Sequence, residues 1–61
     1  MPNISTKELS AIEDQIGQEQ TLVKKYQYLA QMSQDKKIQK SMDEFAQKHQ
    51  KHADTLLTFL N

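Results

Sequence analysis

Two stretches of the sequence carry apolar residues at alternating spacings of three and four, and a short polar segment separates them. The first series runs from Leu9 to Ala30 and the second from Ile38 to Phe59. Such spacing places apolar side chains along one face of an α-helix. The pattern stops at residues 33–35. The sequence therefore predicts an all-α chain in which two long helices are joined by a tight turn.

Local signals predict where these helices begin. Ser5 followed by Glu8 has the spacing of a capping box, which satisfies the free N–H groups of a helix start. Asp35 is a suitable N-cap for the second helix. We expect an N-terminal tail at residues 1–4 and a single hairpin domain at 5–61. Within it the first helix covers about 5–33, the turn about 33–35 and the second helix about 36–60.

A turn centred on Gln34 brings both apolar series into register as an antiparallel hairpin, with Glu19 opposite His49. A chain of 61 residues has little core of its own, and without cysteine it cannot use disulfides. The hairpin would also leave an apolar face open to water, which a second copy can cover. We therefore predict a homodimeric four-helix bundle. Its predicted core consists of Leu9, Ile12, Ile16, Leu22, Val23, Tyr26, Met42, Phe45, Leu56 and Phe59.

Three positions in the helix seam are polar: Glu19, His49 and His52. A two-fold axis through the middle of the bundle would gather two copies of Glu19 and His49 in one layer. Carboxylate and imidazole donors suit Zn, Fe or Mn, so these residues are candidate metal ligands. The alternative is a buried hydrogen-bonded pair that fixes the register of the helices. The sequence leaves both interpretations open.

Composition and motifs exclude several function classes. Lysines balance the acidic residues to give zero net charge, and arginine is absent, so no electrostatic footprint for nucleic acid is present. No apolar run approaches the roughly 20 residues of a membrane span. The first residues lack the basic and apolar regions of a signal peptide, which favours a cytoplasmic location. No nucleophile–base set is visible, so we expect no catalytic residues and no enzyme activity.

The sequence resembles the small spore coat protein F-like family of spore-forming Firmicutes over nearly its whole length. The residues that carry the resemblance are Lys7-Glu8-Leu9, Ile12-Glu13-Asp14, Glu19, Leu22-Val23-Lys24-Lys25-Tyr26, Asp35, Ala46-Gln47-Lys48-His49-Gln50-Lys51-His52 and Leu56-Leu57. The resemblance implies a ferritin-like half, a hairpin whose dimer imitates a four-helix bundle. It also implies a coat or coat-associated protein made in the mother cell, with other spore coat proteins as partners.

One position departs from the ferritin pattern. Ferritin-type bundles carry a Glu on one helix of each pair and Glu-x-x-His on the other. Glu19 and His49 match the first Glu and the His, but Ala46 replaces the second Glu. A di-iron centre would lose two of its usual ligands. We therefore expect a structural or assembly protein without enzymatic activity and without a required cofactor; the alternative is a metal-binding bundle with a reduced Glu/His site.

Overall fold

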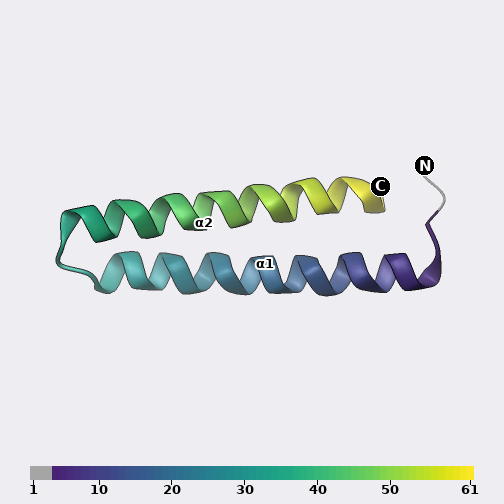
Figure 1. The fold of residues 1–61 in the computed structure, drawn as a ribbon, viewed down its shortest axis with the longest axis horizontal. Helices are drawn as coiled ribbons and strands as arrows, with labels where there is room; N and C mark the ends of the chain where they lie inside the picture. Colours follow the sequence, from purple (N-terminus) through teal and green to yellow (C-terminus); the bar gives the residue numbers. More distant parts are fainter. Residues whose placement is uncertain (1–3) are drawn as a thin grey trace.

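The computed structural model describes residues 4–61 as two antiparallel helices that lie side by side (Figure 1). Helix α1 spans Thr6–Met32, helix α2 spans Lys36–Leu57, and a short 3-10 helix, η1, covers Thr58–Leu60. The molecule is a rod with extents of 47 × 15 × 11 Å. Within residues 4–61 every element of secondary structure is a helix, so the all-α hairpin is confirmed. Apart from Ile4, the predicted N-terminal tail lies outside the described residues.

Helix α1 begins with the capping box that the sequence predicts. The Ser5 hydroxyl accepts a hydrogen bond from the Glu8 backbone N–H at 3.1 Å. In return, the Ser5 backbone N–H donates to the Glu8 carboxylate at 3.0 Å. Two otherwise free donors of the helix start are thereby satisfied, which fixes the first turn.

The turn at residues 33–35 is held by side chains rather than by glycine. Asp35 is the N-cap of α2, and its carboxylate accepts hydrogen bonds from the backbone N–H groups of Lys37 and Ile38. The Asp35 backbone N–H donates to the Ser33 hydroxyl at 3.1 Å. From the other side, the Gln39 side chain donates to the Ser33 carbonyl at 2.6 Å. These contacts stop α1 and start α2 within three residues, which forces the antiparallel arrangement.

Helix α2 ends earlier than the apolar pattern suggests. We expected the second helix to continue to about residue 60, but the α-helix ends at Leu57 and the next three residues form η1. The Thr58 hydroxyl donates to the Thr55 carbonyl at 2.6 Å, and the Thr58 N–H is shared between the carbonyls of Thr55 and Leu56. Tightening into a 3-10 turn is a common way to satisfy the last carbonyls of a helix.

Helix α2 turns alanines, rather than its phenylalanines, toward α1. Ala46 and Ala53 are among its most buried residues, 4% and 0% exposed, although the core predicted from the sequence does not include them. Phe45 and Phe59, which the predicted dimer core includes, are 40% and 46% exposed in the single hairpin. Small side chains at the contact allow two helices to approach closely, so the alanines take the seam and the phenylalanines lie beside it.

The predicted dimer core is therefore distributed unevenly in the single hairpin. Ile16 and Val23 are buried, and Phe45 and Phe59 are exposed. The remaining six, which are half-buried, are Leu9, Ile12, Leu22, Tyr26, Met42 and Leu56. Pairing of two hairpins stays a prediction. Among residues 4–61, no helix combines the length and hydropathy that a membrane crossing requires.

Candidate metal centre

Glu19, His49 and His52 lie together at the middle of the hairpin. Glu19 comes from α1 and is 8% exposed, whereas both histidines come from α2. The Glu19 Oε1 atom lies 2.6 Å from His49 Nδ1 and 3.4 Å from His52 Nδ1. Positions three apart on a helix share a face, so both imidazoles reach the same carboxylate. The pairing of Glu19 with His49, which the register predicted, is present.

A second contact orients the Glu19 carboxylate. The Gln15 side-chain amide, one turn earlier in α1, donates to Glu19 Oε2 at 2.9 Å. This leaves Oε1 for the histidines. The pKa of Glu19 is lowered, first by the hydrogen bond from His49 and then by the one from Gln15. An ionised carboxylate can only accept hydrogen bonds, so the His49 Nδ1–H is the donor in this pair near neutral pH.

The His49 ring is held on three sides. Its plane stacks on the Tyr26 ring, with centroids 5.5 Å apart and planes 6° from parallel. His52 packs edge-on against it at 5.5 Å, and Glu19 accepts from its Nδ1. Tyr26 in turn contacts the Phe45 ring at 5.4 Å. The sequence predicted Tyr26 as core but did not identify this stacking role, because ring stacking depends on the rotation of both helices.

The three side chains are chemically suited to a metal ion. One donor atom from each lies within 4.8 Å of the other two. Tetrahedral ligands at about 2.0–2.2 Å from a common ion are separated by about 3.4 Å, which is the distance observed between Glu19 Oε1 and His52 Nδ1. Mixed imidazole and carboxylate donors suit Zn, Fe and Mn. The group could therefore hold a divalent ion.

The same residues also form a satisfied polar cluster without an ion. Within residues 4–61 no buried side-chain N or O atom lacks a hydrogen-bond partner. Ala46 lies in the seam one turn before His49, where a ferritin-type bundle would carry a bridging carboxylate. The cluster in one chain thus has a single carboxylate, Glu19. This donor set favours one ion rather than a di-iron pair.

Solvent access to the cluster is uneven. The side chain of Glu19 is 10% exposed and that of His49 is 24% exposed, whereas that of His52 is 58% exposed. His52 is therefore the donor most open to an incoming ion or to a second protein surface. The sequence could have indicated Gln15 as well, since it precedes Glu19 by four residues and so lies on the same helix face.

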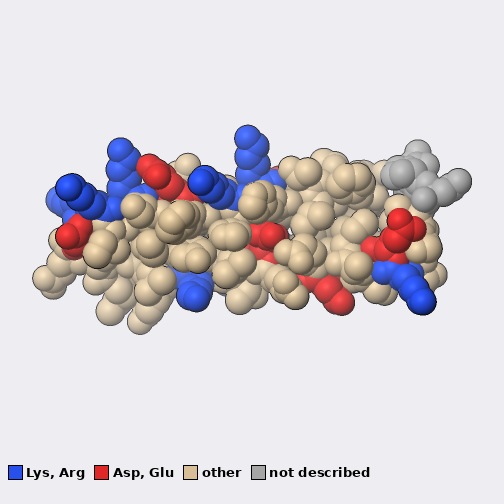
Figure 2. All heavy atoms as spheres, viewed as in Figure 1, with Lys and Arg blue, Asp and Glu red and all other residues tan. Residues whose placement is uncertain are grey.

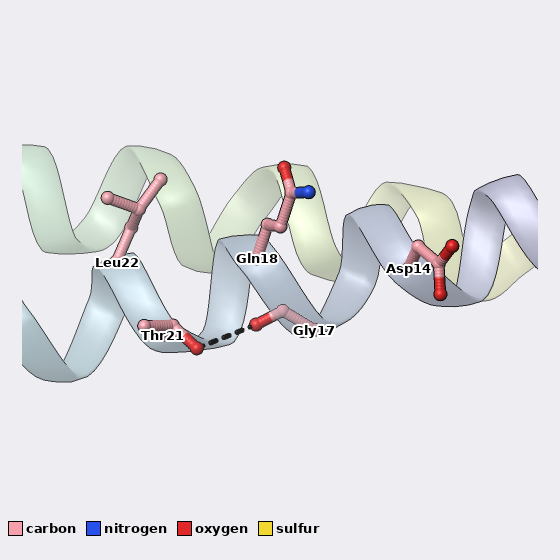
Figure 3. Close-up of a pocket in the computed structure, with 5 residues that line it drawn as sticks. All are labelled: Asp14, Gly17, Gln18, Thr21 and Leu22. Atoms are coloured by element: carbon pink, nitrogen blue, oxygen red, sulfur yellow. Dashed lines mark hydrogen bonds between the residues drawn. The ribbon is translucent and has the colours of Figure 1, made fainter.

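A separate surface hollow surrounds Gly17 on α1 (Figure 3). Asp14, Gln18, Thr21 and Leu22 complete its lining, and the Thr21 hydroxyl donates to the Gly17 carbonyl at 3.0 Å. All five residues come from one helix, and Asp14 is the single titratable group among them. No set of functional groups converges there, so this hollow is not a candidate site.

Comparison of the chain with models of protein families, with curated proteins and with solved structures found no match to any of them.

Proposed function

We propose that this chain is a non-enzymatic assembly module that pairs with a second copy of itself to form a four-helix bundle. The observation that carries the proposal is a set of large apolar side chains, exposed or half-buried, on one side of the hairpin. We call this set the apolar flank. It consists of the half-buried Leu22 and the exposed Leu29, Ile38, Phe45 and Phe59.

Helix geometry supports placing these residues on one side. Leu22 and Leu29 each precede a buried residue of α1 by one position, and Phe45 likewise precedes the buried Ala46 of α2. One position corresponds to a rotation of about 100° in the same sense on each helix. Because the helices are antiparallel, that rotation leads to the same side of the hairpin. The contact between the Tyr26 and Phe45 rings supports this placement.

The buried interior of the hairpin is too small to stabilise the fold without burial of the apolar flank. Within residues 4–61 the buried apolar residues are Ile16, Val23, Ala30, Ala46 and Ala53, and three of these are alanines. A chain of this size with so small a core needs further apolar burial to fold stably. Covering the flank supplies that burial.

A second copy is the partner that the charges favour. The chain has zero net charge, so two copies do not repel one another at long range. Figure 2 shows one long face of the hairpin, on which uncharged side chains predominate and most of the visible lysines lie along the left and middle parts of its upper edge. Every copy carries the same flank, which is the requirement for a self-complementary two-fold interface.

The mass of the untagged protein in solution tests this proposal. Sedimentation equilibrium over a range of protein concentrations should give twice the 7.1 kDa chain mass, with dissociation only at the lowest concentrations. A folded monomer at all concentrations would overturn the proposal. A helical chain that becomes stable only when a different protein is added would instead assign the flank to a hetero-bundle.

The resemblance to the spore coat protein F-like family supports a proposal for the cellular location of this module. We propose that the dimer is made in the mother cell and joins other proteins of a spore coat. A fluorescent fusion expressed in a sporulating cell should collect at the spore surface. Fluorescence that stays in the cytoplasm throughout sporulation would argue against the coat assignment while leaving the dimer unaffected.

Metal binding is a second candidate function, favoured by the convergence of Glu19, His49 and His52 within 4.8 Å. Metal content per chain after anaerobic dialysis against Fe(II), Mn(II) or Zn(II) tests it. Retained metal that disappears in His49→Gln would support a site. If the folded protein retains no metal, the role of the cluster is to fix the register of the two helices.

A further inference from the structure

The exposed side of the cluster of Glu19, His49 and His52 lies on the same side of the hairpin as the apolar flank. His52 precedes the buried Ala53 by one position, just as Phe45 precedes Ala46. Ring contacts connect the two features, since Tyr26 packs against both Phe45 and His49, and His49 packs against His52. A protein that covers the flank would therefore also cover the open side of the cluster.

The cluster also lies at the midpoint of α1. Glu19 is the central residue of this 27-residue helix, with thirteen residues on each side of it. Two copies can pair in opposite directions about a two-fold axis that is perpendicular to the helices and passes through this midpoint. Equivalent atoms of the two clusters then face one another across the axis. The exposed His52 imidazole, 58% accessible in one hairpin, then faces its counterpart.

Two donors in one hairpin already have the separation of one edge of a tetrahedron. Glu19 Oε1 and His52 Nδ1 lie 3.4 Å apart, about the separation of two ligands on one zinc ion. His49 Nδ1 is closer to Glu19, at 2.6 Å, and donates a hydrogen bond to it. A carboxylate oxygen can accept that hydrogen bond and still bind an ion with its other lone pair. His49 and Gln15 would then orient the carboxylate ligand.

We propose that one divalent ion of the zinc class binds on the two-fold axis of the dimer, held by Glu19 and His52 of both copies. One hairpin supplies two of the four ligands, so the site is incomplete without the second copy. This inference rests on the proposed dimer and deepens the metal-binding candidate. It predicts that zinc binding and dimer formation strengthen each other.

Zinc titration of the metal-free, untagged protein tests the shared site, with stoichiometry from calorimetry and dimer Kd from sedimentation equilibrium. We expect about half an ion per chain, as a four-ligand site shared by two copies requires. We also expect zinc to lower the dimer Kd by at least about tenfold. Both effects should be lost in His52→Gln and retained in the control Lys51→Gln, which alters an adjacent exposed side chain.

The other outcomes separate this proposal from the dimer itself. One ion per chain with an unchanged Kd would overturn the shared site and leave a site within one hairpin. A dimer that does not retain zinc would overturn the shared site and leave the assembly module intact. A monomer at all zinc and protein concentrations would overturn both proposals. Equal tightening by Mg²⁺, which prefers oxygen ligands, would show general screening of charge and overturn the site.

Discussion

Replacement of Phe45 by alanine is the most direct test of the apolar flank. The ring is 40% exposed in the single hairpin, so part of its surface is free to be buried by a second copy. The change keeps a good helix former in α2 and adds no charge. Its main expected effect is therefore on association.

The size of the effect follows from the exposed area. A phenylalanine side chain buries on the order of 150–250 Å² when fully covered, so the 40% that is exposed corresponds to about 60–100 Å² in each copy. At about 25 cal/mol per Å², this area contributes about 1.5–2.5 kcal/mol per copy. A symmetric dimer loses the contact twice, so we expect a loss of about 3–5 kcal/mol, or a Kd weaker by roughly a hundredfold to several thousandfold.

Sedimentation equilibrium of the metal-free protein gives the dimer Kd of the unaltered chain and of Phe45→Ala. Tyr28→Ala is the matched control, because Tyr28 is 60% exposed but lies five positions from the buried Val23, about 140° round the helix. Because Phe45 also contacts Tyr26, helix content by circular dichroism must be compared, and Ile38→Ala offers a second flank variant. Unchanged Kd values in Phe45→Ala and Ile38→Ala, with a native-like spectrum, would refute the flank as the interface.

Three further predictions concern stability. Gly17→Ala should stabilise the protein by about 1 kcal/mol, because an added Cβ meets no atom within 4 Å and alanine favours helix; an unchanged or lower thermal midpoint would contradict this. Ala53→Leu should cost about 1–3 kcal/mol in urea unfolding, because the site is 0% exposed, whereas Ala11→Leu at an exposed position should not; equal effects would contradict the observed rotation of α2. The pKa of Glu8 is lowered, chiefly because the Ser5 backbone N–H donates to its carboxylate and secondarily by the Ser5 side chain. The contribution of the Glu8 carboxylate to folding stability is therefore fully present above the unfolded-state pKa of about 4.3. It is lost as the pH falls through the lower folded-state pKa. Glu8→Gln should weaken the fall in urea midpoint between about pH 7 and about pH 3, and an identical fall in both proteins would contradict the role of this carboxylate.

Much of the hairpin could be predicted because its determinants are local. Ser5 and Glu8 make the predicted capping box, and Asp35 makes the predicted cap of α2. Such hydrogen bonds join residues two or three positions apart, so spacing in the sequence is enough to foresee them. The end of α2 was harder to predict, because the hydroxyl of Thr58 competes with the helical pattern for the last carbonyls.

The candidate site was predictable in its position and not in its detail. Two stiff helices joined by a short turn have a fixed register, so counting from Gln34 placed Glu19 opposite His49. The exposure of His52 and the stacking of Tyr26 on His49 could not be predicted by counting residues. Both depend on how far each helix is rotated about its axis, and the spacing of the apolar residues is compatible with more than one rotation.

The sequence by itself determined two helices, their capped starts and the layer in which Glu19 meets His49, because these follow from residue spacing along the chain. Only the tertiary structure decided which side of α2 faces α1. Packing selected Ala46 and Ala53 for the seam, since small side chains let the helices approach closely. As a consequence, Phe45 lies beside the seam on the flank that we propose a second copy covers.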